Sequence, residues 1–70
     1  MTKYATRVWN DEYEEHSHNI MVLANHYGLE EIKDKGRLLF FVFNTRQQAN
    51  DFANEIFESY KINTKAIEWC

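Results

Sequence analysis

The chain has 70 residues, of which 44% are hydrophobic and 16% aromatic, a composition typical of one globular domain. Its formal net charge of -3 argues against a general nucleic-acid binder, because such proteins are more often basic. The single cysteine, Cys70, excludes a disulfide framework, and residues 1–7 do not resemble a signal peptide, so we expect a cytoplasmic protein.

The first elements predicted in chain order are a strand and a long helix. Residues 3–9 have no helical period and are rich in aromatic and β-branched side chains, which indicates a strand. Asp11 and Glu14 then have the spacing of a capping box. Apolar residues recur about every 3.6 positions until Gly28, so we expect one helix over 11–27. This stripe comprises Tyr13, His16, Ile20, Leu23, Ala24 and Tyr27.

The middle of the sequence predicts a hairpin that contains the most apolar run. Residues 29–32 (LEEI) precede a turn and are predicted to form a short edge strand, and residues 33–36 have the composition of that turn. Residues 37–43 (RLLFFVF) are apolar at positions that would lie on both faces of a strand. Such a run predicts a strand at the centre of a sheet.

The last part of the sequence predicts a second helix and a final strand. Thr45 and Gln48 have the T-x-x-Q spacing of a capping box, and an apolar stripe follows, so we expect a helix over 46–60. Residues 61–69 are assigned to the last strand. The order strand, helix, strand, strand, helix, strand predicts a single ferredoxin-like βαββαβ domain over residues 1–70, an α+β fold with two helices on one face of a four-stranded antiparallel sheet.

The other face of this predicted sheet has no helix to cover it. If Leu39, Phe41 and Phe43 face the helices, the alternation of a strand places a second set of side chains on the open side. The candidate binding residues there are Arg7, Trp9, Arg37, Leu38, Phe40, Lys65 and Trp69, with Ile67 among them. Exposed apolar patches usually mark interaction sites. A second copy in a homodimer, a different protein, or a single-stranded nucleic acid could each cover this patch.

Residues 35–53 resemble the third strand and second helix of the RNA-recognition motif family, whose RNP1 signature joins a basic residue, a glycine and aromatic residues. Aligned on Phe43, the chain has Phe40 at one stacking position of that signature. Leu38 stands at the other, where the family prefers an aromatic residue, and Leu39 replaces the inner glycine. The first strand does not match the RNP2 signature. The resemblance covers about a quarter of the chain and implies a ferredoxin-like fold, with binding of single-stranded RNA or DNA as an alternative function.

The predicted first helix begins with an acidic helix end, formed by Asp11, Glu12, Glu14 and Glu15. These carboxylates suit the helix dipole and solubility, or alternatively the basic groove of a partner. In the second interpretation, the helix end would suit a small inhibitor that competes for a nucleic-acid-binding site.

Chemistry at a reactive site is not expected from the residue pattern. His16, His18 and His26 point in different directions around one helix, so we expect no metal site. No Ser-His-Asp set, P-loop or glycine-rich loop is present, and Cys70 has no evident base. We therefore expect neither an enzyme nor a bound cofactor.

The sequence as a whole predicts a small non-enzymatic protein-binding module of the regulatory or inhibitor type. It would act through the open sheet face, with the acidic helix end as a second candidate surface. Compact, acidic, cysteine-poor domains of this size are associated with accessory proteins of phages and mobile elements. No membrane partner is expected, because the apolar run is far shorter than the roughly 20 residues of a spanning helix.

Overall fold

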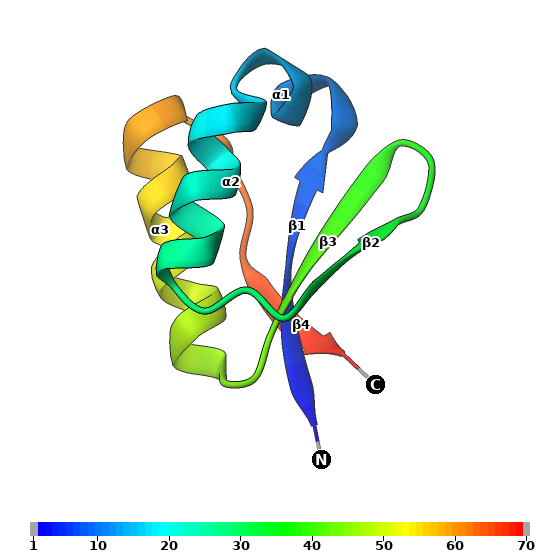
Figure 1. Cartoon of the computed structure of the whole chain (residues 1–70), viewed down its shortest axis with the longest axis vertical. Helices are drawn as coiled ribbons and strands as arrows, with labels where there is room; N and C mark the ends of the chain where they lie inside the picture. Colours follow the sequence, from blue (N-terminus) through cyan, green and yellow to red (C-terminus); the bar gives the residue numbers. More distant parts are fainter. Residues whose placement is uncertain (1, 70) are drawn as a thin grey trace.

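The computed structural model describes residues 2–69 as an α+β fold with a four-stranded antiparallel sheet and three helices (Figure 1). The elements in chain order are β1 (Lys3–Trp9), α1 (Asn10–Glu15), α2 (Ser17–His26), β2 (Glu31–Asp34), β3 (Leu38–Phe43), α3 (Arg46–Tyr60) and β4 (Ala66–Trp69). The predicted α+β class and the antiparallel sheet of four strands are confirmed. Cys70, predicted to be non-catalytic, lies outside the described residues.

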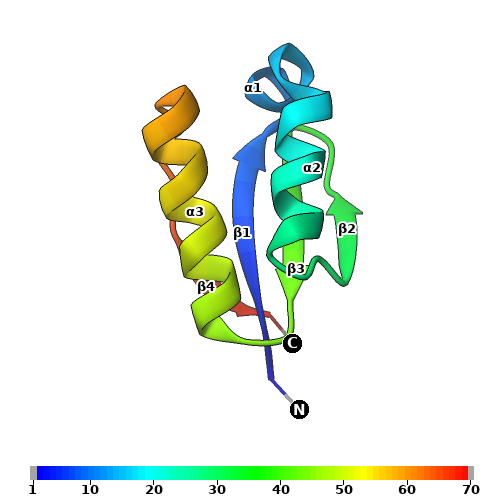
Figure 2. The same cartoon turned by 60° about the vertical axis from the view of Figure 1, so that its left-hand side comes forward.

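The strand order is β2-β3-β1-β4, so β1 and the apolar β3 lie in the centre of the sheet. Arg7 pairs with Phe40 between β1 and β3, and Thr6 pairs with Ala66 between β1 and β4. Helices α2 and α3 lie next to each other on one face of this sheet (Figure 2). A central β3 explains the apolar run, because its side chains are removed from water on both faces.

The hydrophobic core lies between these two helices and the sheet. It is formed by Val8, Ile20, Ala24, Leu39, Phe41, Phe43, Ala49, Phe52, Ile56 and Ile62. The Phe52 ring contacts Phe41 and Phe43 at centroid distances of 5.2 and 5.3 Å. Full burial of one such ring contributes about 1.5–3 kcal/mol, so this aromatic cluster supplies a large share of the stability of so small a domain.

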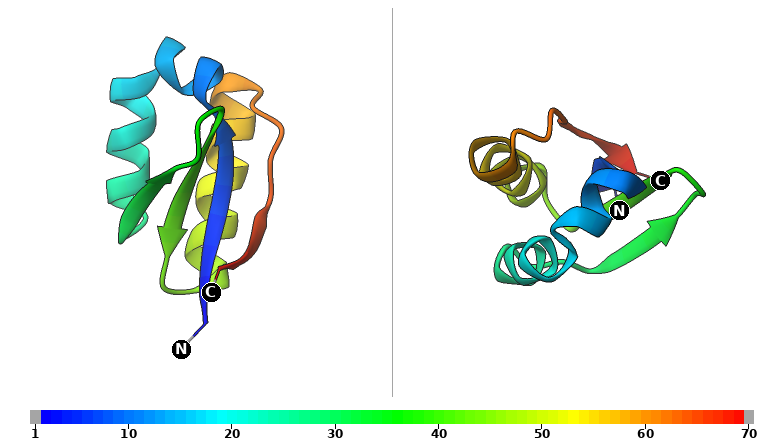
Figure 3. Two further views of the ribbon diagram at one scale, coloured as in Figure 1. Left: turned by 90° about the vertical axis from the view of Figure 1, so that its right-hand side faces the viewer. Right: turned by 90° about the horizontal axis from the view of Figure 1, so that it is seen from above.

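The single helix predicted over residues 11–27 is wrong, because the chain leaves the helical conformation at His16. The backbone dihedrals there are φ -131° and ψ 29°, and the His16 ring stacks on Tyr60 with centroids 4.4 Å apart. The break lets α1 cross the end of the sheet while α2 runs along it (Figure 3). The apolar stripe remains in register across the break, since Tyr13 contacts the core and Ile20 is buried in it.

The predicted capping box of Asp11 and Glu14 is also wrong. Helix α1 begins at Asn10, and its N-cap residue, Trp9, makes no side-chain capping hydrogen bond. The Asn10 N–H instead donates to the Arg37 carbonyl at 2.8 Å, which extends the pairing of β1 with β3 by one residue. The hairpin therefore fixes the point at which the chain turns from strand to helix.

Helix α3 matches its predicted bounds, and its capping box is confirmed. Thr45 Oγ1 accepts a hydrogen bond from the Gln48 N–H at 3.2 Å, and Gln48 Oε1 accepts one from the Thr45 N–H at 3.1 Å. Three strands differ in their bounds from the prediction: β2 spans Glu31–Asp34 instead of 29–32, β3 begins at Leu38 instead of 37, and β4 begins at Ala66 instead of 61. Ile62, which precedes β4, is buried in the core, but residues 61–65 have no partner in the strand pairing.

Candidate functional site on the open sheet face

The face of the sheet opposite α2 and α3 is the open face, and no described helix packs on it (Figure 3). Paired residues of antiparallel strands point to the same side, so the register defines its members. They are Lys3, Ala5, Arg7 and Trp9 of β1, Glu31 and Lys33 of β2, Leu38, Phe40 and Val42 of β3, and Ile67 and Trp69 of β4. The structure thus brings together five of the seven predicted binding residues.

Phe40 and Trp69 form an aromatic pair across β1. Their ring centroids are 5.0 Å apart and the ring planes are tilted by 31°. Ala5 and Val42 lie in the neighbouring row of the open face, and both are fully buried although no helix covers them. The aromatic pair therefore shields part of the open face, and both rings are themselves only partly exposed.

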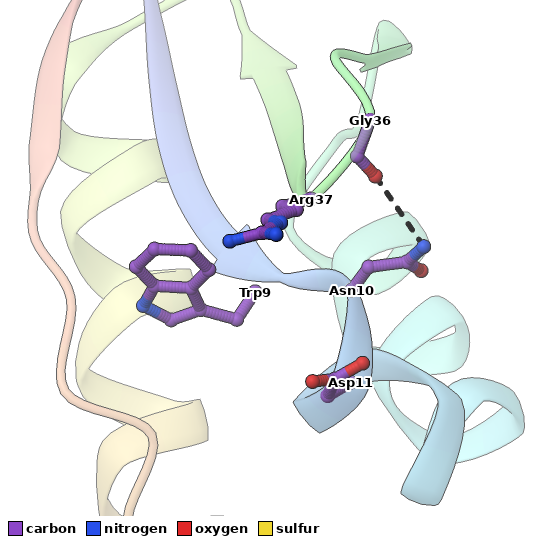
Figure 4. A pocket seen from close by; sticks show the side chains of 5 residues that line it. All are labelled: Trp9, Asn10, Asp11, Gly36 and Arg37. Carbon is purple, nitrogen blue, oxygen red and sulfur yellow. Dashed lines mark hydrogen bonds between the residues drawn. The ribbon is translucent and has the colours of Figure 1, made fainter.

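Trp9 is the most accessible aromatic side chain of the open face. It is 53% exposed and lies at the end of β1, opposite the partly buried Leu38. A pocket of about 380 Å³ adjoins its indole, between the end of β1 and the start of β3 (Figure 4). The pocket is lined by Trp9, Asn10, Asp11, Gly36 and Arg37.

Backbone and side-chain contacts hold this pocket in shape. Asn10 Nδ2 donates to the Gly36 carbonyl at 3.4 Å, and the Gly36 N–H donates to Asp34 Oδ1 at 2.9 Å. In Figure 4 the side chains of Trp9 and Arg37 extend to the same side, whereas Asn10 points toward Gly36. Arg37 thus lies beside Trp9 in the pocket, although it precedes β3 and is not part of the strand pairing.

The open face is cationic in a chain of net charge -3. It carries Lys3, Arg7 and Lys33 against the single carboxylate of Glu31, which lies 3.4 Å from the Lys33 ammonium. Among residues 2–69, neither Arg7 nor Arg37 forms an ion pair. The surplus of positive charge favours a partner that carries negative charge.

Some members of the open face were missed by the sequence analysis, and one predicted member lies apart. Lys33 was assigned to a turn, because the predicted strand ended at residue 32, whereas β2 continues to Asp34. Lys3 follows from the alternation of β1 and could have been found by extending it. Lys65 is exposed, but it precedes β4 and has no partner in the strand pairing.

The acidic helix end lies on α1, next to the pocket. Asp11, Glu14 and Glu15 are exposed and Glu12 is partly buried. Asp11 and Glu12 lie in the first turn, where the positive end of the helix dipole stabilises negative charge. Asp11 belongs to both surfaces, because it also lines the pocket beside Trp9.

Two of the three histidines, His16 and His26, make aromatic contacts. Besides the stacking of His16 on Tyr60, the His26 ring lies edge-on to Tyr27 at a centroid distance of 5.1 Å. Within residues 2–69, no group of three histidine, cysteine, aspartate or glutamate side chains could hold a metal ion. The Tyr27 hydroxyl donates to Glu55 Oε1 at 3.2 Å, and partial burial together with this carboxylate raises the pKa of Tyr27.

No protein-family model, curated protein or solved structure matches this chain. None of the described helices is both long and apolar enough to span a membrane. The function is therefore inferred from the geometry and charge of the open face.

Proposed function

We propose that this chain is a small protein-binding module that contacts its partner through the open face. The observation that supports this proposal is the 53% exposed indole of Trp9, which stands beside Leu38 on a sheet face without a covering helix. Tryptophan is enriched among the residues that contribute most to protein interfaces, because it buries a large area with few rotatable bonds. The contacting rings of Phe40 and Trp69 extend the apolar part of this surface.

The topology supports assignment to the ferredoxin-like βαββαβ fold. The order β2-β3-β1-β4 has the first and third strands in the centre, and each helical connection joins two parallel, non-adjacent strands. Helices α1 and α2 together take the place of the first helix of that fold. Because this fold carries many unrelated functions, the proposed regulatory or inhibitor role rests on the open face and not on the topology.

Partner capture with matched variants tests the proposal. Trp9→Ala is compared with Phe57→Ala, which removes a similarly exposed aromatic side chain (48%) from α3 on the other side of the sheet. We expect Trp9→Ala to abolish capture of a protein from extracts of the source cells, and Phe57→Ala to retain it. Loss with Phe57→Ala alone would move the binding surface to the helices.

A single-stranded nucleic acid is the second candidate partner, and the cationic charge of the open face favours it. Arg7 lies directly across from Phe40, so a base stacked on the ring would have its phosphate near the guanidinium. Each lost phosphate contact lowers the slope of log affinity against log salt by about 0.7 for a single strand. Arg7→Gln would therefore reduce the salt dependence of oligonucleotide binding only if this candidate is correct.

A further inference from the structure

We infer that the Trp9 end of the open face binds an extended, acidic segment of another protein. This inference rests on the proposed function and specifies the chemistry of the partner. It is supported by the two arginines near Trp9 and by the mixed charge of the adjoining pocket. The other two candidate partners, a second copy of the chain and a nucleic acid, fit this surface poorly.

Two guanidinium groups flank the exposed indole. Arg7 precedes Trp9 by two residues and therefore lies on the same face of β1, and Arg37 lines the pocket beside the indole. Both arginines are exposed, and neither forms an ion pair with another residue of the described chain. A guanidinium binds a carboxylate through two parallel hydrogen bonds, so acidic side chains on either side of an apolar anchor match this arrangement.

The pocket beside Trp9 offers both signs of charge. Arg37 lines it together with the carboxylate of Asp11, in a volume of about 380 Å³. A polypeptide segment can present a carboxylate to Arg37 and a backbone N–H to Asp11, with an apolar side chain against the indole. A polyanion has no donor for Asp11 in its phosphate backbone.

A second copy of the chain is a poor binding partner for this surface. A two-fold interface places the same patch of both copies together. Stacking two open faces would therefore bring the cations Arg7 and Lys33 of one copy toward those of the other, with few carboxylates between them. Such juxtaposed like charges oppose association.

A nucleic acid is also disfavoured at this end of the face. Single strands bind by stacking successive bases on several aromatic rings. Phe40 and Trp69 already contact each other, so Trp9 is the most exposed ring available for stacking.

Titration of the ¹⁵N-labelled protein with model peptides tests the inference. The probes are a blocked octapeptide of alternating glutamate and leucine, a matched octapeptide of lysine and leucine, and an eight-residue oligothymidylate. We expect the acidic peptide to shift the Trp9 indole N–H signal, assigned with Trp9→Phe, and to bind about tenfold more tightly than the basic one. The double variant Arg7→Gln with Arg37→Gln should weaken the acidic peptide about tenfold, whereas Lys65→Gln should leave it unchanged.

The other outcomes separate failure of the inference from failure of the proposed function. Equal binding of both peptides at the open face would overturn the acidic partner and keep the protein-binding module. If neither peptide shifts any open-face signal, both proposals fail. Tighter binding of oligothymidylate, with a salt dependence of affinity that is reduced in the arginine variant, would overturn the acidic peptide and identify a nucleic acid as the partner. Dispersed amide signals in every variant provide the control for folding.

Discussion

Phe40 and Trp69 belong to strands that are not neighbours, yet their rings are in contact, with centroids 5.0 Å apart. On the strand between them, β1, Arg7 pairs with Phe40 and Lys3 pairs with Trp69. Ala5 lies between these two positions on the same face and is fully buried. A small side chain at this position leaves room for the two rings to meet across β1. The open face therefore combines a shielded aromatic pair with the separate, exposed Trp9.

The two tryptophans are expected to differ in their contribution to stability. Trp69→Ala removes the partner ring of Phe40 and exposes apolar surface beneath it, so it should lower the free energy of unfolding by about 2 kcal/mol. Trp9→Ala removes a side chain that is 53% exposed and should cost less than about 1 kcal/mol. Urea denaturation of both variants measures the difference, and equal losses would contradict the separation of the two rings.

A buried hydroxyl connects β1 to α3. Thr6 Oγ1 donates to the Ala49 carbonyl at 2.8 Å, and Thr6 is fully buried. Thr6→Val keeps the shape but loses this hydrogen bond, so we expect a loss of about 1 kcal/mol in urea denaturation. Thr64→Val is the matched control: its hydroxyl donates to the Arg7 carbonyl at a partly exposed position, where water can replace it. A smaller effect at Thr6 than at Thr64 would contradict this account.

The two glycines should respond differently to substitution by alanine. Both have positive φ, 92° at Gly28 and 81° at Gly36, so both substitutions introduce left-handed strain of about 1 kcal/mol. A Cβ at Gly28 would also lie 2.5 Å from Gln48 Nε2, whereas one at Gly36 meets nothing within 4 Å. Because Gln48 completes the capping box of α3, moving it should add about 1 kcal/mol. Thermal unfolding should therefore show the larger decrease in Tm for Gly28→Ala.

The hydrogen bond from Tyr27 to Glu55 predicts a loss of stability at alkaline pH. Partial burial and the neighbouring carboxylate raise the pKa of Tyr27 in the folded state above its ordinary value of 10.0. Above pH 10 the unfolded chain loses this proton while the folded chain keeps it, so the stabilisation present at neutral pH is lost as the pH rises through the folded-state pKa. Tyr27→Phe should show a smaller alkaline decrease in the urea midpoint than the wild type. Identical pH profiles would rule out this contribution.

The regular part of the fold was predictable because local signals and hydrophobic period agreed. The capping box of Thr45 and Gln48 and the stripe that follows it define α3, and the apolar run 37–43 identifies a central strand. The break at His16 was not predictable in this way. At the break His16 stacks on Tyr60, which is distant along the chain, while the apolar stripe itself continues across the break, so the local pattern contains no sign of it.

The candidate site was predicted in composition but not in organisation. Alternation along β1 and β3 was sufficient to place Trp9 and Phe40 on the open face. The contact of Phe40 with Trp69 depends on the register of β4, and the pocket beside Trp9 depends on the hairpin that brings Arg37 back to the end of β1. Both features arise from pairings between distant segments, which a local pattern does not encode.

The pairing of β1 with β4 joins the first strand of the domain to the last, from Lys3 with Trp69 to Thr6 with Ala66. During translation, β1 leaves the ribosome long before β4 has been synthesised. One edge of β1, a central strand, therefore lacks a hydrogen-bonding neighbour until β4 emerges, and open strand edges pair readily with other chains. Chains truncated after α3 should accordingly be the form most prone to aggregation, and slow translation of the codons for β4 would prolong that interval.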